Sequence, residues 1–322
     1  MNIKNNNYLE LFTLQKAVRD FFTNQDFLEV ITPPMVSNPG MEVHIHPFEV
    51  YSKKDGRTLN QYLHTSPEFH MKNLLSEGFE KIFTMSYCFR DEPSSSLHRN
   101  QFVMLEWYRL HANYEEIMND LEKLILFCSS KLKREKVVQQ KAINKKTIQE
   151  IFQEVLNLDI LEFVENKSNQ EFKQVIEENY KDVPLPEEEL SFEDYFFLLF
   201  LNKIEPELKK YPFIILYEYP APLKALSSLK KEDPRVCERF ELYANGIELC
   251  NCFQELSDLN EQTQRFDEQA ILKEQLYQYK LPEARLLYNA LEKGIPRASG
   301  IALGIERLLM ILTGCENPFL TD

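Results

Sequence analysis

The chain opens with an amphipathic helical pattern that ends at prolines. Leu14, Val18 and Phe22 recur at helical spacing, and the short apolar run 27–30 follows. Pro33 then blocks any further helix or central strand, because proline lacks a backbone N–H donor. We expect a helix, a short strand and a proline-terminated stop in this order.

A second pattern predicts two strands joined by a polar loop. Residues 82–85 lead in and residues 102–105 lead out, while residues 90–100 between them are rich in charge and serine. Asn113 and Glu116 have the spacing of a capping box, which predicts a helix start. Apolar residues then keep helical spacing at Tyr114, Ile117, Leu121, Leu124, Ile125 and Cys128.

The middle of the chain has the character of an insertion. Residues 131–146 form a basic patch, which is either a solvated linker, the interpretation we favour, or a docking site for an acidic partner. Residues 147–200 read as mostly helical, and the run 213–217 reads as a buried strand. We therefore expect one domain over residues 1–322, with a mostly helical insertion at about 131–205.

Composition narrows the class of protein. Of 322 residues, 43% are hydrophobic and 27% charged, which is enough for one large core. The net charge of −14 argues against broad binding of nucleic acid, which favours basic proteins.

No apolar run approaches the roughly 20 residues that span a bilayer, and residues 1–7 lack a signal-peptide core. Six cysteines without paired spacing favour a reducing compartment, so we expect a cytoplasmic protein without a membrane partner. Cys250 and Cys252 lack a second ligand pair at zinc-site spacing and are not expected to bind metal.

Two segments carry charges that suit phosphate and metal chemistry. Arg90 and Glu92 on the polar loop can bind a phosphate and an amine-bearing base, although surface hairpins often carry such charges. Glu241 and Glu248 flank Asn245-Gly246, the strongest short hairpin signal. Such a hairpin places both carboxylates on one side, where they either bind a divalent cation or are simply exposed.

A third segment alternates small and aliphatic residues before an acid and an arginine. Gly300, Ala302 and Gly304 share one face of the predicted strand and allow another group to approach closely. Arg307 then falls at the start of a helix, where anions are favoured. A plain buried strand explains the aliphatic residues but not the row of small ones.

Together these segments resemble motifs 2 and 3 of class II aminoacyl-tRNA synthetases, and the helix ending before Pro33 resembles motif 1. The resemblance covers about residues 10–315 and is closest to the lysyl type. Residues 64–72, 104–109 and 246–249 are similar to a lysyl paralogue group that joins (R)-β-lysine to elongation factor P. The resemblance implies an α+β fold, the class II catalytic core, with a mainly antiparallel β-sheet flanked by helices. It also implies a homodimer built on motif 1.

The same resemblance implies roles for individual residues. Arg90 and Arg307 hold the α- and γ-phosphates of ATP, and Glu241 and Glu248 hold Mg²⁺. The rest of the ATP site is expected at Asp91, Glu92, Arg99, Phe102, Leu249 and Gly304. The amino-acid pocket is expected at Ser66, Glu68, Glu106, Tyr108, Asn251, Phe253, Glu255 and Ala302.

Several departures bear on which reaction is expected. Ser66 and Ala302 replace the alanine and glycine usual in lysyl-tRNA synthetases, and both favour the paralogue. Only about ten residues precede the first helix, so we expect no OB-fold anticodon domain and no tRNA substrate. Arg99 and Cys252 depart from both groups. A truncated lysyl-tRNA synthetase and a non-catalytic regulator that binds ATP or an amino acid remain the alternatives.

Overall fold

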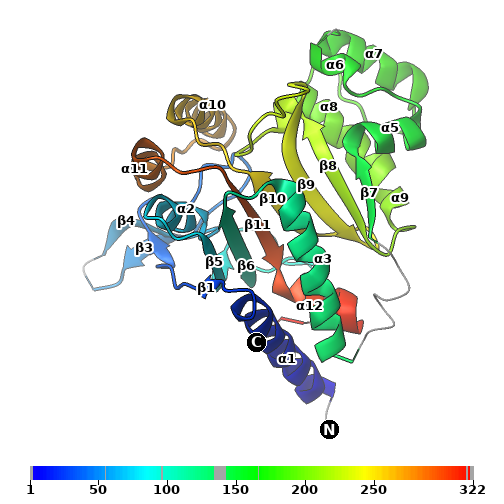
Figure 1. Cartoon of the computed structure of the whole chain (residues 1–322). Helices are drawn as coiled ribbons and strands as arrows, with labels where there is room; N and C mark the ends of the chain where they lie inside the picture. Colours follow the sequence, from blue (N-terminus) through cyan, green and yellow to red (C-terminus); the bar gives the residue numbers. More distant parts are fainter. Residues whose placement is uncertain are drawn as a thin grey trace. The chain divides into compact units, whose positions relative to one another are not determined.

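The chain forms two structural units in the computed structural model, which describes residues 3–54, 56–95, 97–133, 143–165, 167–316 and 318–319. The first unit comprises Met1–Gln139 and Glu255–Asp322, and the second comprises Gln140–Gln254. Each unit has its own β-strands and its own helices (Figure 1).

The main sheet of the first unit has the strand order β1-β5-β6-β11. β1 (Leu28–Glu29) lies parallel to β5 (Lys81–Phe89). β6 (Gln101–Leu110) is central and pairs antiparallel with β5 and with β11 (Ala298–Gly304). Because β5 and β6 are connected by the polar loop, the two predicted strands and their loop are confirmed.

Alternation along β6 gives the sheet two faces, one covered by α1 and one that carries Glu106. Trp107 of β6 and Phe83 of β5 pack on Phe22 of α1 (Ile3–Thr23), with ring centroids 5.2 and 4.8 Å from that of Phe22. Neighbouring residues of a strand point to opposite faces, so Glu106 and Tyr108 project away from α1. The predicted first helix therefore covers the apolar face and leaves the other face for polar chemistry.

The remaining helices of the first unit hold this sheet in place. α3 (Tyr114–Lys131) packs on α1 and β11, and α12 (Ile305–Thr313) packs on α1 and β6. α2 (Glu68–Ser76) packs on β6 and on α11 (Arg285–Lys293), which in turn contacts α10 (Leu259–Tyr277). The predicted capping box starts α3, since the side chain of Asn113 accepts from the Glu116 N–H and the Glu116 side chain accepts from the Asn113 N–H.

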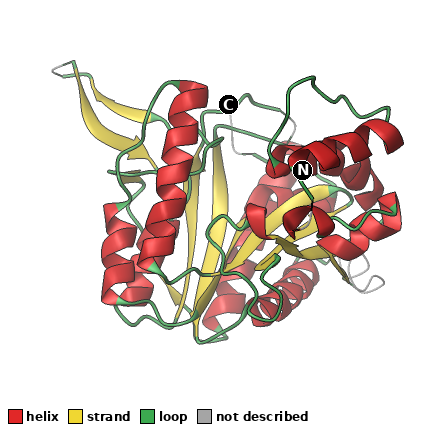
Figure 2. Cartoon of the chain, turned by 90° about the horizontal axis from the view of Figure 1, so that it is seen from above, coloured by secondary structure: helices red, strands yellow, loops and turns green. Residues whose placement is uncertain are grey.

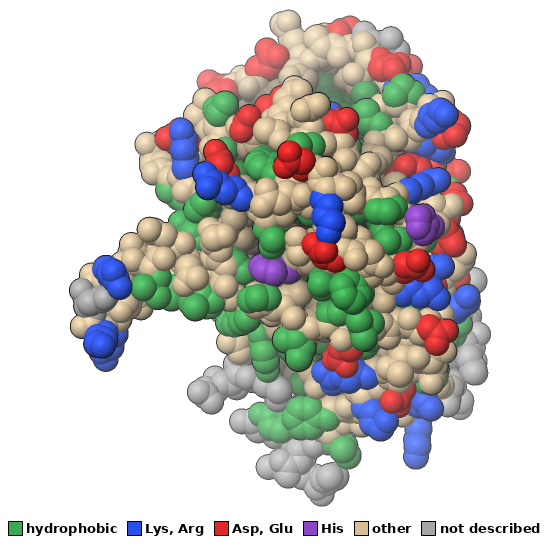
Figure 3. All heavy atoms as spheres, turned by 60° about the vertical axis from the view of Figure 1, so that its left-hand side comes forward, with side chains coloured by type: hydrophobic (Ala, Val, Ile, Leu, Met, Phe, Trp, Pro, Cys, Tyr) green, Lys and Arg blue, Asp and Glu red, His purple; other side chains and the backbone are tan. Residues whose placement is uncertain are grey.

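A small antiparallel sheet of β2 (Met35–Val36), β4 (Arg57–Leu63) and β3 (Glu49–Ser52) completes the first unit. The β3–β4 hairpin extends well away from the other elements of its unit (Figures 1 and 2). Its projecting end carries the exposed side chains of Lys53, Lys54 and Arg57, seen as a basic tip in Figure 3.

The second unit has the strand order β10-β9-β8-β7. β10 (Ile247–Gln254), β9 (Val236–Ala244) and β8 (Ile214–Pro220) are antiparallel, while β7 (Asn144–Thr147) runs parallel to β8. Its helical elements are α5 (Ile148–Leu156), α6 (Glu162–Glu165), α7 (Asn169–Asn179), α8 (Phe192–Leu199), η1 (Phe200–Ile204), α9 (Glu205–Leu208) and η2 (Ala221–Leu223). Stacked rings fill their core, with centroids 5.1 Å apart for Phe152 and Phe196 and 4.3 Å apart for Phe163 and Phe172.

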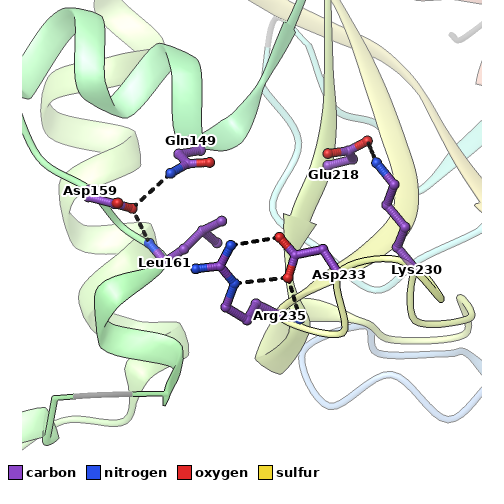
Figure 4. Close-up of polar contacts among 7 residues, drawn as sticks. All are labelled: Gln149, Asp159, Leu161, Glu218, Lys230, Asp233 and Arg235. Atoms are coloured by element: carbon purple, nitrogen blue, oxygen red, sulfur yellow. Dashed lines mark hydrogen bonds and ion pairs between the residues drawn. The ribbon is translucent and has the colours of Figure 1, made fainter.

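Hydrogen bonds and ion pairs of polar side chains stabilise loops of the second unit (Figure 4). Asp159 accepts from the side chain of Gln149 and from the backbone N–H of Leu161, both at 3.1 Å. In the loop before β9, Arg235 donates twice to Asp233, at 2.9 and 2.8 Å, and this guanidinium lowers the pKa of that carboxyl. These contacts are local, so they order individual loops and do not link distant elements.

The linker interpretation of the basic patch is wrong for residues 144–147. Residues 144–147 are not a linker but form β7, where Lys146 pairs with Glu154. Strand pairing with β8 decides this, and it is not visible in the local charge pattern. Residues 134–142 lie outside the described part of the chain. The expected single domain with an insertion at about 131–205 stays a prediction, although helices do occupy much of residues 148–208.

Candidate functional site

The face of β6 turned away from α1 carries a buried carboxylate, Glu106, that accepts hydrogen bonds from two hydroxyls. The Ser66 hydroxyl donates to its Oε1 at 2.6 Å, and the Tyr108 hydroxyl donates to its Oε2 at 2.9 Å. Ser66 also accepts the backbone N–H of Glu68 at 3.0 Å, at the start of α2. The four residues therefore form one hydrogen-bonded group, and their expected role in an amino-acid pocket stays a prediction.

Strand register places the small residues of β11 beside this group. Ala302 lies opposite Glu106 and Gly300 lies opposite Tyr108 in the β6–β11 ladder. A Cβ atom on Gly300 would overlap the Tyr108 ring and lie 2.5 Å from Oε1 of Glu255. The close approach predicted for the small-residue face is thus made by Tyr108 and Glu255.

A buried lysine connects two of the carboxylates. Nζ of Lys72 lies 2.6 Å from Oε1 of Glu68 and 2.6 Å from Oε2 of Glu255, and the Lys72 side chain is 1% exposed. Lys72 and Glu68 are one helical turn apart on α2, whereas Glu255 directly follows β10. Glu68, Glu106 and Glu255 therefore lie in one cluster with the ammonium group of Lys72.

Burial perturbs the ionisation of this pocket. Desolvation, reinforced by the charge of Glu68, raises the pKa of Glu106 to about 8. Desolvation also raises the pKa of Glu255 to about 7, although Lys72 opposes the shift. Burial alone would lower the pKa of Lys72, but the carboxylates of Glu255 and Glu68 outweigh it and raise that pKa. An added cation in this pocket would therefore be met by carboxyl groups that ionise near neutral pH.

The loop between β5 and β6 presents the first predicted phosphate ligand. Arg90 lies over the ring of Phe102, with its guanidinium carbon 5.3 Å from the ring centroid. The side chain of Asn100 donates to the backbone oxygens of Arg90 and Glu92 at 3.1 and 2.9 Å and so fixes the loop. Asp91 is exposed, and its backbone N–H donates to the carbonyl of His46 at 2.7 Å.

Arg307 and Arg99 take different positions at this loop. Arg307 lies in the first turn of α12, as predicted, and its Nη2 is 2.9 Å from Nε2 of His98. Arg99 donates to the carbonyl of His98 at 2.9 Å and stacks on Phe319, 4.8 Å from the ring centroid. An adenine contact at Arg99 therefore stays a prediction, and in this structure its guanidinium is held by its own loop.

The second unit contains the predicted carboxylate hairpin. Asn245 and Gly246 adopt positive φ angles of 51° and 83°, and Ala244 pairs with Ile247 across the turn. Glu248 lies opposite Tyr243, and Glu241 lies two residues before Tyr243, so both glutamates share a face of the sheet. The predicted hairpin is confirmed, and its register accounts for the expected placement of the two carboxylates.

Glu241 is more heavily bonded than the sequence indicated. Its Oε1 accepts from Arg239 at 2.5 Å, and its Oε2 accepts from the hydroxyls of Tyr219 and Tyr243 at 2.5 and 2.6 Å. Arg239 also donates to the side chain of Asn251 at 3.2 Å. Its guanidinium carbon lies 4.5 Å from the ring centroid of Tyr219 and 5.6 Å from that of Phe253. Leu249 is buried and Gly304 is half-buried, each within its own unit.

Sequence reasoning gave no role to Lys72, Asn100 or Arg239. Asn100 and Lys72 lie inside the segments that carry the resemblance, and Arg239 precedes Glu241 by one strand repeat. Arg239 could have been found from the sequence, because it is a charged residue within a strand whose other residues are mostly apolar. Lys72 gave none, because exposed lysines are common on helices.

The structure also bears on compartment and metal chemistry. Among the residues that the structure describes, no helix combines the length and apolar character that crossing a bilayer requires. All six cysteines are free thiols. In the described part of the chain, no group of three or more His, Cys, Asp or Glu side chains forms a protein-only metal centre, and this includes Cys250 and Cys252.

Known proteins resemble this chain over nearly its whole length. Residues 2–317 match the family of tRNA synthetases class II (D, K and N). The chain is 35% identical over 309 residues to the elongation factor P–(R)-β-lysine ligase of Pasteurella multocida, covering 93% of this chain and 88% of the relative. It is 34% identical over 317 residues to the Hamiltonella defensa protein of the same name, covering 97% and 92%. The namesake from Salmonella arizonae is 33% identical over 313 residues, covering 97% and 92%.

Proposed function

Because the chain belongs to the class II tRNA synthetases of the D, K and N group, we propose that it is an ATP-dependent ligase for (R)-β-lysine. In this function it forms the β-lysyl adenylate and transfers the β-lysyl group to a lysine side chain of elongation factor P. The observation that carries the proposal is the buried carboxylate pocket on β6, in which Ser66 and Ala302 both adjoin Glu106. At these two positions the chain departs from the lysyl-tRNA synthetase pattern in the direction of the paralogue group.

The pocket chemistry suits an amino acid with two ammonium groups. Glu255 and Tyr108 receive the distal ammonium, and Glu68, Glu106 and Ser66 surround the inner one. Asn251 and Phe253 line the aliphatic chain. Carboxyl groups with raised pKa values release their protons when a cation binds, so ammonium groups are accepted and neutral side chains are rejected strongly.

The first chemical step is an in-line displacement at phosphorus. A carboxylate oxygen of β-lysine attacks the α-phosphorus of ATP, the bond to the bridging oxygen breaks, and pyrophosphate leaves. Arg90 binds the α-phosphate and the substrate carboxylate, and Arg307 binds the γ-phosphate. Fixed cations of this kind stabilise the charge that spreads over the phosphoryl oxygens. Adenine stacks on Phe102, and the remaining nucleotide contacts fall to Asp91, Glu92, Arg99, Leu249 and Gly304.

The hairpin of β9 and β10 fits a magnesium ion with phosphate oxygens as additional ligands. A carboxylate offers about four lone-pair positions, and three donors already occupy Glu241, so Glu241 would offer the metal about one remaining position beside Glu248. When bound, Mg²⁺ neutralises phosphate charge during the displacement. The protein's part is to hold Glu241 rigid through Arg239, Tyr219 and Tyr243.

In the second step, the lysine amine of the acceptor attacks the carbonyl carbon of the adenylate and AMP leaves. We propose elongation factor P as the acceptor, as the names of the relatives state for those proteins. The net charge of −14 supports a protein acceptor over tRNA, because binding a long polyanion depends on many Lys and Arg contacts.

Two further expectations complete the proposal. Exposed apolar side chains on α1 and after it favour a homodimer, since Phe12 is 52% exposed and Ile31 96% exposed. Six free thiols favour the cytoplasm as the compartment.

Pyrophosphate exchange with each candidate amino acid tests this function. Exchange should require Mg²⁺ and be strongest with (R)-β-lysine and weaker with α-lysine. A clear preference for α-lysine would support a truncated lysyl-tRNA synthetase. Absence of exchange with every amino acid, together with measurable ATP binding, would support a non-catalytic regulator.

A further inference from the structure

Lys72 is an unusual group to find inside an amino-acid pocket. Its side chain is 1% exposed, and its ammonium lies 2.6 Å from each of two carboxylates that belong to distant segments of the chain. The Glu68 and Glu255 side chains are 12% and 3% exposed, so all three charges have left bulk water. Burying such a group costs several kcal/mol per ion by typical magnitudes, and close pairing only partly offsets that cost.

Stability by itself is a poor reason for this arrangement. Replacing a buried ion network with apolar side chains of similar volume is often neutral or stabilising. The two partners of Lys72 are also the carboxylates that the proposed function assigns to different ends of the substrate. Lys72 lies between Glu68, which is assigned to the inner ammonium of the substrate, and Glu255, which is assigned to the distal ammonium.

The charge count of the pocket supports a role in binding. Glu68, Glu106 and Glu255 together carry three negative charges when ionised, and Lys72 supplies one positive charge. The balance of two negative charges matches two substrate ammonium groups. Without Lys72 the pocket holds three carboxyl groups at close range, and such clusters keep their protons.

We propose that Lys72 is a positioning residue that sets the separation of Glu68 and Glu255 for a substrate with two ammonium groups. This inference rests on the proposed function. Lys72 itself does not touch the reacting atoms. Its ammonium acts through the two carboxylates, as a fixed spacer between them.

The proposal predicts a specific pH signature, and the neighbouring charges determine its sign. The ionisable groups that face the ion pairs, from every packed element, are Glu68 on α2, Glu106 and Tyr108 on β6, Glu255 after β10, and Glu42, which is within electrostatic reach of Glu68. On α11, which also packs on α2, the ammonium of Lys293 is engaged by Glu77 at 2.5 Å. Glu255 already has a raised pKa of about 7, and removing Lys72 raises it further. Loss of Lys72 should therefore matter most at low pH and least at high pH.

The test compares Lys72→Met and Lys72→Arg with the unaltered protein in amino-acid-dependent pyrophosphate exchange. For Lys72→Met, kcat/KM for (R)-β-lysine should fall about a hundredfold at neutral pH, because a buried pair loses one partner. KM for ATP should stay unchanged. The deficit should shrink as the pH rises from about 6.5 to about 9, because the Glu255 carboxyl then ionises without the charge of Lys72. Lys72→Arg keeps the charge, so it should keep the pH profile of the unaltered protein while losing part of kcat/KM.

Lys293→Met is the matched control, because it removes another lysine–glutamate pair that involves α2 but lies outside the pocket. It should leave exchange and its pH profile unchanged. A deficit of Lys72→Met that is constant with pH, or equal losses for ATP and amino acid, would overturn the proposal in favour of a structural role. If thermal unfolding shows that Lys72→Met is not folded, Lys72→Arg provides the test. Its loss in kcat/KM for (R)-β-lysine is then compared with its change in KM for ATP. Failure of the unaltered protein to activate (R)-β-lysine would instead refute the proposed function.

Discussion

Gly300 and Tyr108 face each other across the β6–β11 ladder so closely that no Cβ atom fits between the Gly300 backbone and the Tyr108 ring. The same space is bounded by Oε1 of Glu255, 2.5 Å from where that Cβ would lie. The glycine thus leaves room for the Tyr108 ring and the Glu255 carboxylate beside the same point of the β11 backbone.

Gly300→Ala should therefore impair the amino-acid pocket selectively. The added methyl displaces Tyr108 and Glu255, and misplacing such groups should lower kcat/KM for (R)-β-lysine by about a hundredfold. KM for ATP should change little. Gly78→Ala is the control, because a Cβ there meets nothing within 4 Å and its positive φ of 93° costs only stability. Equal effects of both variants on exchange would contradict the assignment.

Substitutions of the two hairpin glutamates, Glu241 and Glu248, should differ in their effects on activity and on stability. Glu248→Gln removes a proposed metal ligand and should reduce exchange about a hundredfold or more. Glu241→Gln also leaves Arg239 without its charge partner, so it should cost about 3 kcal/mol of stability as well. Arg307→Ala should resemble Glu248→Gln. Exchange assays and thermal unfolding measure both quantities, and near-normal exchange in Glu248→Gln and Arg307→Ala would favour a regulator.

Without substrate bound, the free energy of unfolding of the unaltered protein should fall as the pH rises, when compared with that of a Glu106→Gln variant. Glu106 has a folded pKa of about 8, above its ordinary value, so the folded state binds its proton more tightly than the unfolded state. That contribution is fully present below about pH 4.5 and is lost as the pH rises through about 8. The difference should reach at most about 4 kcal/mol. Chemical denaturation from about pH 5 to about pH 9 measures it, and parallel curves would refute the raised pKa.

The apolar surface of α1 and the segment after it should form a dimer interface. Phe12→Asp or Ile31→Asp places a charge in that interface and should produce monomers, because an unpaired buried charge opposes association. Light scattering at micromolar concentration gives the mass of each form. Lys53→Asp on the projecting hairpin is the control for a surface charge change and should leave the dimer intact. A stable monomer of the unaltered chain would exclude the homodimer.

Label from (R)-β-lysine should reach a protein lysine and not tRNA. Incubation with ATP and labelled β-lysine, with either elongation factor P or total tRNA, distinguishes the acceptors. Transfer to elongation factor P should weaken with salt if basic residues steer the partner, mainly through the association rate. Label on tRNA alone would establish the synthetase alternative.

The sequence by itself determined the elements whose signals are local. The capping box at Asn113, the hairpin at Asn245-Gly246 and the strands around the Arg90 loop follow from short-range backbone preferences and side-chain period. The family motifs indicated which glutamates belong to the candidate site, because a resemblance assigns residue types at known spacings. Domain limits and ligand contacts stay predictions on this basis.

Tertiary structure decided which charges meet. Residues 144–147 became a strand because β8 offers a parallel partner, and a basic run does not reveal that pairing. Lys72 and Glu255 are 183 positions apart in the sequence and meet only because β6, β11 and α2 bring them together. Arg239 meets Asn251 of the neighbouring strand through strand register. Such contacts depend on chain closure over long separations and on burial, which turn ordinary lysines and glutamates into ion pairs with shifted pKa values.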